Sequence, residues 1–186
     1  MTDIIHLPGI GNSGRRHWHS RWEADDPSIR RFAPACWDEP DLSDWIAALE
    51  HAVRAARTPP VLVAHSLACL LVAHWHRVSD RPIAGAVLVA VPDPASPVFP
   101  APAAGFADIP RMRFRFPSLI VASTDDPYGS LPYVRRQAEH WGSALTVIGA
   151  AGHINGQSGL GDWPDGRALL RDFVTRVQAG AGVTRA

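Results

Sequence analysis

The sequence predicts an α/β fold, a compact three-layer sandwich in which helices cover both faces of a mostly parallel sheet of about six strands. Short apolar runs alternate along the chain with stretches of helical periodicity, which is typical of such a sheet. The 186 residues, 46% of them hydrophobic, suffice for one buried core but are too few for two ordinary domains. We therefore expect a single domain over residues 1–178, followed by a frayed tail at residues 179–186.

The predicted strands are short, apolar and bounded by turn-forming residues, whereas the predicted helices have apolar side chains at helical spacing. Strands are expected at Ile4–Leu7, Arg31–Ala35, Pro60–Ala64, Ile83–Val89, Ser118–Ala122 and Leu145–Ile148, and helices at His17–Ala24, Leu42–Ala56, Leu67–Val78, Leu131–Trp141 and Gly166–Gln178. Residues Leu42–Ala56 have an apolar stripe and should cover one face of the sheet. Residues Leu67–Val78 begin apolar all round, as expected for a helix at the buried centre.

Composition and charge exclude several classes of protein. The formal net charge is zero, all 18 basic residues are Arg, and charges of both signs are interspersed, so no nucleic-acid partner is expected. Cys36 and Cys69 lie far apart in the sequence, which argues against a disulfide scaffold. Residues 1–7 lack a basic segment followed by an apolar one, and no apolar run approaches the roughly 18 residues of a membrane span. These features predict a cytoplasmic protein with no membrane partner.

The most informative stretch is Ala64-His65-Ser66-Leu67-Ala68, which places a serine between an apolar strand and an apolar helix. In a nucleophile elbow the serine occupies a strained turn, and the residues two positions before and after it must be small. Ala64 and Ala68 meet this requirement less fully than glycine would. A serine after a buried strand is more often a helix N-cap than a nucleophile, so this stretch alone does not decide between the two roles.

Acidic residues follow the predicted strand Ser118–Ala122 at its carboxyl end, where ligands bind in open α/β sheets. Asp125 and Asp126 are adjacent there, and Pro127 biases Asp126 toward an extended conformation that would fix its carboxylate. Asp-Asp-Pro is also ordinary turn and cap chemistry. The residues alone therefore leave both the catalytic role of this segment and the choice between Asp125 and Asp126 open.

His153 is the best placed of the nine histidines, because Gly149–His153 forms a flexible loop after the last predicted strand. The others lie on predicted helices or near strands, and His65 is interpreted as structural. The chain thus supplies a serine, an aspartate and a histidine in the order typical of α/β nucleophile-elbow enzymes. A serine hydroxyl needs a neighbouring imidazole to remove its proton during attack, and a carboxylate to orient that imidazole.

Backbone N–H groups that stabilise a developing oxyanion are expected from two places. One is Leu67, immediately after the candidate nucleophile. The other is the loop over His6–Gly14, whose glycines let backbone amides face a ligand; Ile10 is favoured and Gly11 is second. Each such donor is typically worth about 3 kcal/mol to the transition state.

The same loop has competing interpretations. It lacks the Gly-Lys-Ser/Thr ending of a P-loop, which argues against a phosphate cradle, but Gly9–Gly14 matches a lone G-x-G-x-x-G. A dinucleotide site would leave Ser66 and His153 unexplained, so no cofactor is expected. No cluster of His, Cys and Asp has the spacing of metal ligands, so no metal is expected either.

Two features bear on how the site is covered. The Pro- and Ala-rich segment Pro92–Gly105 has no clear periodicity and is either a minimal lid over the site or a surface excursion without contact to substrate. The seven tryptophans are interpreted mostly as core residues, with some available to line an acyl pocket.

The chain resembles the retinoblastoma-binding-protein-9 and YdeN-like family of small serine hydrolases, especially its bacterial branch. The resemblance covers Ile4 to Phe173 and depends on four motifs in the same order. These are Leu7–Gly14 with His17-Trp18, Ala64–Ala68, Ala122–Tyr128, and Gly152–Asn155.

The resemblance implies a compact α/β-hydrolase fold without a large cap domain and a catalytic triad of Ser66, Asp126 and His153. The acid of the family motif is the residue before proline, which selects Asp126. The family's segment after the histidine, here Asn155–Gly161, is expected on the pocket rim. The elbow departs from the wider superfamily, where glycine is common at the positions of Ala64 and Ala68.

The implied activity is cofactor-independent hydrolysis of carboxylic esters, with amides as a second class, through an acyl-enzyme intermediate. The partner is then a small-molecule ester or amide. The alternative is a protein-interaction module that keeps the hydrolase fold and has only incidental turnover, because fold does not fix function. Such a module would tolerate loss of the triad and would expose a sizeable apolar patch.

Overall fold

A single parallel sheet forms the centre of the molecule in the computed structural model, which describes residues 2–183 and the side chains of residues 2–180. The strand order is β2-β1-β3-β4-β5-β6, and every neighbouring pair is parallel. The strands are β1 (Ile4–Leu7), β2 (Arg30–Arg31), β3 (Val61–His65), β4 (Gly85–Val89), β5 (Ser118–Ala122) and β6 (Ala144–Val147). The predicted α/β fold is therefore confirmed.

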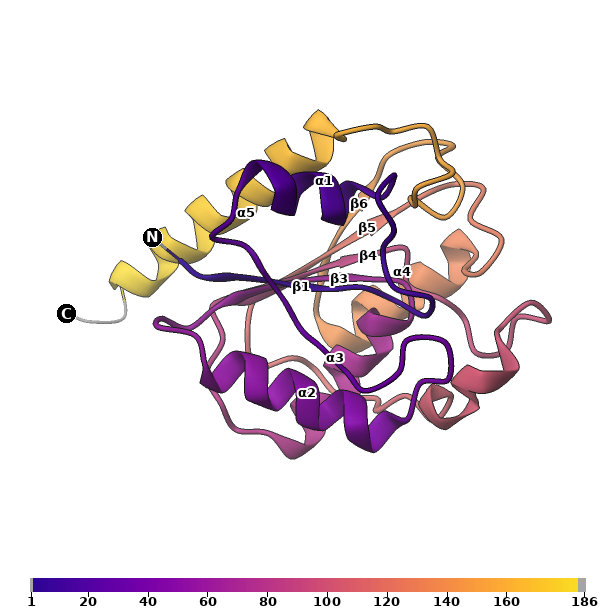
Figure 1. Cartoon of the computed structure of the whole chain (residues 1–186), viewed down its shortest axis with the longest axis horizontal. Helices are drawn as coiled ribbons and strands as arrows, with labels where there is room; N and C mark the ends of the chain where they lie inside the picture. The colour runs from indigo at the N-terminus through magenta and orange to yellow at the C-terminus, as the bar shows by residue number, and fades with distance from the viewer. Residues whose placement is uncertain (1, 184–186) are drawn as a thin grey trace.

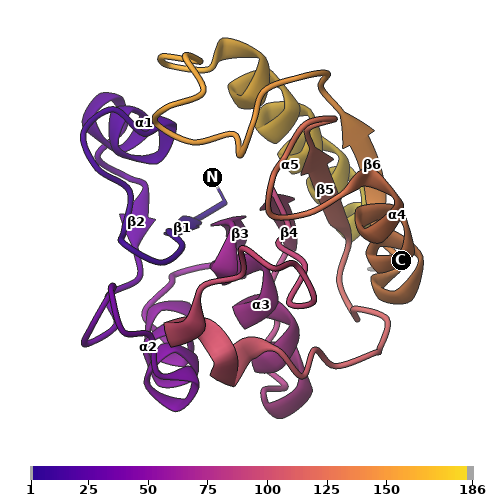
Figure 2. The same cartoon turned by 90° about the vertical axis from the view of Figure 1, so that its right-hand side faces the viewer.

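Helices cover both faces of this sheet (Figures 1 and 2). They are α1 (Trp18–Asp25), α2 (Leu42–Arg54), α3 (Leu67–Val78), the short 3-10 helix η1 (Ala101–Phe106), α4 (Leu131–Trp141) and α5 (Pro164–Val183). Helices α2, α3 and α4 pack on one face through the larger core, which mixes aliphatic and aromatic side chains. Helices α1 and α5 pack on the other face through a smaller core that is rich in tryptophan.

The central strand β3 shows why the sequence reads as a continuous apolar run here. All five of its residues are buried, because side chains that alternate along the strand meet helices on both faces. Leu62 and Ala64 belong to the core under α2–α4, whereas Val61 and Val63 belong to the core under α1 and α5. His65 shares the side of Val61 and Val63, and its ring accordingly lies beside α1.

Most element ends lie within two residues of the sequence-based expectation, η1 lies at the end of the segment expected as a loop, and two elements differ more. Strand β2 comprises only Arg30–Arg31, where Arg31–Ala35 was expected, because it lies at the sheet edge and Pro34 has no N–H for a longer ladder. Helix α5 extends to Val183, so residues 179–183 of the expected tail are helical. Residues 184–186 of that tail lie outside the described part of the chain.

Candidate active site

The carboxyl ends of the parallel strands meet at one edge of the sheet, and the predicted site residues lie in the loops there. The β1–α1 loop covers residues 8–17, the β5–α4 loop residues 123–130, and the β6–α5 loop residues 148–163. Ser66 forms the turn between β3 and α3. This is the edge at which open α/β sheets bind ligands.

Ser66 occupies a strained turn, with φ 56° and ψ −126°. A positive φ is uncommon for a residue with a side chain and costs free energy that the surroundings must offset. The turn is held because the Ser66 N–H donates to Val89 O at 2.9 Å, and because Ala64 and Ala68 are fully buried. Although Ser66 stands at the N-cap position of α3, its hydroxyl makes no capping hydrogen bond. Its side chain therefore does not play the N-cap role that the sequence left open.

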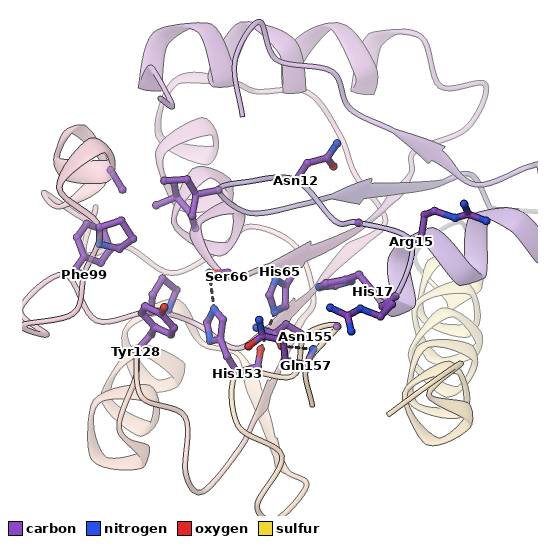
Figure 3. A pocket seen from close by; sticks show the side chains of 18 residues that line it. Asn12, Arg15, His17, His65, Ser66, Phe99, Tyr128, His153, Asn155 and Gln157 are labelled. Carbon is purple, nitrogen blue, oxygen red and sulfur yellow. Dashed lines mark hydrogen bonds between the residues drawn. The ribbon is translucent and has the colours of Figure 1, made fainter. Parts of the chain in front are cut away.

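His153 connects Ser66 with Asp126, and Figure 3 shows its hydrogen bond to Ser66. Its Nε2 lies 2.8 Å from Ser66 Oγ, and its Nδ1 lies 2.9 and 3.0 Å from the two carboxylate oxygens of Asp126. An ionised carboxylate only accepts hydrogen bonds, so Nδ1 carries the proton and Nε2 is left to accept the serine hydroxyl. The side chains of His153 and Asp126 are 10% and 3% exposed, which limits competition from water.

The adjacent carboxylates of Asp125 and Asp126 have different partners. Asp126 receives the His153 imidazole and the Tyr128 N–H, the latter at 2.9 Å. Asp125 instead accepts the Ser123 hydroxyl at 2.6 Å and two backbone N–H groups of the β6–α5 loop, from residues 151 and 152, at 2.9 and 2.8 Å. These bonds, that from Ser123 first, lower the pKa of Asp125. Asp125 therefore ties the β5–α4 loop to the residues directly before His153.

The β1–α1 loop approaches the elbow so closely that only glycine fits at position 9. A Cβ on Gly9 would lie 2.9 Å from Ser66 Cβ and 3.0 Å from the carbonyl oxygen of His65. The N–H of Gly11 donates to Trp37 O at 2.9 Å and is therefore already engaged. Within residues 2–183, no hydrogen bond uses the N–H of Ile10 or Leu67, and both residues line the pocket.

Four buried histidines contact one another where β1, the β1–α1 loop, α1 and β3 meet: His6, His17, His19 and His65. His65 Nε2 donates to the carbonyl oxygen of His153 at 2.9 Å, so it fixes the backbone of that residue as well as filling space. Burial lowers the pKa of His65 well below its usual range. Burial, aided by the charge of Arg31, lowers the pKa of His17 to about 3. Both rings are therefore neutral at physiological pH.

A pocket of about 570 Å³ opens above Ser66 and His153. Pro92, Phe99, Pro100 and Ala103 line it. The segment Pro92–Gly105 therefore contacts the pocket and is not a surface excursion remote from it. Of the segment Asn155–Gly161, which the family resemblance placed on the rim, residues 155–157 line the pocket. No tryptophan of the described residues lines this pocket, and Trp18, Trp22, Trp45, Trp75, Trp141 and Trp163 are buried in the two cores.

Sequence reasoning missed three contributions to this geometry. It treated Asp125 only as a rival of Asp126, it gave His65 no link to His153, and it did not single out Gly9 for its approach to the elbow. The available signal was only the type and order of residues, since each contribution depends on contacts between loops distant in sequence.

Other kinds of site find little support. Among the side chains described, no group of three or more His, Cys, Asp or Glu is arranged to hold a metal ion. Cys36 and Cys69 are both free. None of the helices in residues 2–183 is long and apolar enough to cross a membrane.

Comparisons with known proteins identify the family of this chain. The family model described as serine hydrolase matches residues 4–172. A protein described as a YdeN-like hydrolase from Pectobacterium atrosepticum is 30% identical, with a TM-score of 0.86, over 95% of this chain and 92% of that one. Among curated proteins, none matches the chain.

More distant structures share the fold. The ydeN gene product of B. subtilis is 19% identical with a TM-score of 0.73, over 94% of this chain and 100% of that one. A monoacylglycerol lipase from Paleococcus ferrophilus is 14% identical with a TM-score of 0.71, over 92% and 93% of the two chains. The resemblance expected from the four sequence motifs is confirmed, and the chain belongs to the serine hydrolase family, among its small YdeN-like members.

Proposed function

We propose that this serine hydrolase cleaves carboxylic esters, with amides as a second substrate class, by means of a triad of Ser66, His153 and Asp126. The observation that carries the proposal is the unbroken chain of hydrogen bonds from Ser66 Oγ through His153 to Asp126, held at a strained elbow. Membership of the serine hydrolase family supports the reaction class.

The reaction begins when the Ser66 hydroxyl attacks the carbonyl carbon of the ester. His153 Nε2 takes the hydroxyl proton as the new C–O bond forms, and Asp126 stabilises the imidazolium through Nδ1. The tetrahedral intermediate collapses when His153 returns the proton to the leaving oxygen. The acyl-enzyme is then hydrolysed by water, with His153 acting as base and Ser66 as leaving group.

The negative oxygen of the intermediate needs hydrogen-bond donors that are in place before reaction. The N–H groups of Leu67 and Ile10 take this role in the proposal, because neither N–H has a partner in the described chain and both residues line the pocket. Gly11, the second choice from the sequence, is disfavoured because its N–H is bound to Trp37 O.

The interaction-module alternative receives no support from the surface. Its expected sign is a contiguous exposed apolar patch. In the described part of the chain, the exposed large apolar side chains are Val78, Val98 and Val147, which lie on α3, in the segment before η1 and on β6. Single exposed valines of this kind are ordinary.

The test is labelling by a fluorophosphonate, which reacts with activated serines. Rapid labelling of the native protein is expected, together with its loss in Ser66→Ala and His153→Ala. Ser28→Ala, at an exposed serine that does not line the pocket, should label like the native protein. Circular dichroism would establish that each variant is folded. Folded native protein that remains unlabelled would refute the proposal.

A further inference from the structure

The pocket has two chemically different sides, and Ser66 and His153 lie between them (Figure 3). Phe99 and Tyr128 lie on one side, and the nearby lining residues Pro92, Pro100 and Ala103 are also apolar. Arg15, His17, Asn155 and Gln157 lie on the other side. A substrate that fills both sides must therefore be apolar at one end and polar at the other.

The polar side carries positive charge that the protein does not neutralise. Arg15 and Arg16 line the pocket, and within the described residues neither forms an ion pair. No Asp or Glu side chain lines the pocket. In a chain whose formal net charge is zero, this is a local positive potential at the mouth of the candidate active site.

The side-chain amides on this side of the pocket also have hydrogen-bond donors that are not used within the protein. Asn12 Oδ1 accepts the Ser13 N–H and the Arg31 guanidinium, both at 2.7 Å. Asn155 Oδ1 accepts the Gln157 N–H at 2.8 Å. The carbonyl side of each amide is thus engaged, and its NH₂ group remains to donate.

His17 adds a donor that lacks an acceptor. Its side chain lines the pocket and is 6% exposed. Its Nδ1 accepts the His19 N–H at 3.2 Å, so the proton of the neutral ring is on Nε2. That Nε2 is buried without a hydrogen-bond partner among the described residues. Buried donors are normally paired; the Nε2 atoms of His6 and His19 also lack partners among the described residues, but His17 alone of these three histidines lines the pocket.

We propose that the pocket binds an ester with a carboxylate on one side of the scissile bond and an apolar group on the other, with Arg15 and Arg16 as the counter-charges. Donors without competing acceptors match a carboxylate, which only accepts hydrogen bonds, and guanidinium groups fit its planar geometry. This inference rests on the proposed function and specifies its substrate class.

The test compares anionic and neutral esters in two matched pairs, one for each orientation of the charge. The first pair is mono-para-nitrophenyl glutarate and para-nitrophenyl hexanoate; the second is para-butyryloxybenzoate and para-tolyl butyrate. In at least one pair, the native protein should prefer the anion in kcat/KM by about tenfold. The preference should fall as salt is raised, because exposed charges are screened.

Variants assign the preference to the two arginines. Arg15→Gln/Arg16→Gln should bring the anionic-to-neutral ratio close to one. The matched control is Arg135→Gln/Arg136→Gln, an adjacent exposed pair on α4 that makes the same change in net charge; the ratio should stay at the native value. Equal use of anion and neutral ester in both pairs, or an equal loss in the control, would overturn the inference.

A binding measurement separates this inference from the proposed function. Calorimetry with Ser66→Ala protein and the glutarate monoester requires no turnover, and Arg15→Gln/Arg16→Gln in that background should weaken binding about tenfold. Unchanged binding would contradict the anion site even if the native enzyme is active. Absence of fluorophosphonate labelling would instead contradict the proposed function.

Discussion

Two regions share one edge of the sheet: the loops that carry Ser66, Asp126 and His153, and the β1–α1 loop. Their polar groups differ in how fully they are hydrogen-bonded within the protein. In the former, the Ser66 hydroxyl, both His153 ring nitrogens and the Asp126 carboxylate bind one another. The β1–α1 loop instead leaves two arginines without ion pairs in the described chain and the buried Nε2 of His17 without a partner.

This difference separates two tasks. Groups whose hydrogen bonds are made within the protein have their geometry set before substrate arrives, which is the requirement for a preorganised reaction centre. Groups whose hydrogen-bond donors have no partner in the protein can instead form hydrogen bonds to acceptors on a ligand, and so contribute to binding it. The proposed triad would therefore fix the chemistry, and the β1–α1 loop would select the substrate.

Exchanging either of the neighbouring aspartates for asparagine tests the most rigid part of this arrangement. Asp126→Asn should lower kcat by about 10⁴-fold, because an amide can donate to Nδ1 and favour the wrong tautomer of His153. Asp125→Asn should lower kcat by at most about 10²-fold, since it only loosens the loop before His153. Steady-state kinetics on one ester would compare them. Equal losses would mean that the two carboxylates are not divided as proposed.

A substitution at Gly9 tests the contact between the β1–α1 loop and the turn that bears Ser66. Gly9→Ala would press a methyl group against Ser66 Cβ and the His65 carbonyl, so kcat should fall by about 10²-fold. Gly105→Ala is the matched control, because a Cβ there meets only Leu42 Cβ at 3.9 Å and Gly105 does not line the pocket, so its activity should stay near native. The proposed contact would be wrong if both variants kept full activity while thermal melts showed them folded.

The buried histidines beside the β1–α1 loop make stability depend on pH. The pKa of His17 is about 3 in the folded protein against an ordinary value of 6.5, so the unfolded chain binds the proton first as pH falls. Stability from this group is fully present above pH 6.5 and is lost progressively toward pH 3. Between pH 7 and pH 5 the loss is about 2 kcal/mol from His17 alone.

Urea unfolding at these pH values would measure the effect. His17→Asn keeps a side chain that can cap α1 but does not titrate, so its free energy of unfolding should fall less steeply below pH 6.5. His65 and His19, whose pKa values burial also lowers, should keep part of the slope. Parallel pH profiles of the native protein and the variant would exclude this account of His17.

Much of the fold and of the candidate site could be predicted from the sequence, because both depend in part on local patterns of residues. Apolar runs predicted the parallel strands, and the small residues around Ser66 predicted the turn that bears it. The choice between Asp125 and Asp126 was not accessible from the residues alone, and only the family resemblance selected the latter. Their carboxylates differ in direction, which depends on where the β6–α5 loop folds back across the sheet.

The apolar wall of the pocket, formed by Pro92, Phe99, Pro100, Ala103 and Tyr128, gives the smallest expected effect, because its contribution is spread over several side chains. Phe99 is partly buried, and Phe99→Ala should lower kcat/KM for a long-chain ester by about threefold to tenfold while changing an acetyl ester little. A series of para-nitrophenyl esters of increasing chain length would show this as a flatter dependence on length. An equal loss for every chain length would place Phe99 in support of the reaction centre instead of the wall, and the division between the two regions would need to be redrawn.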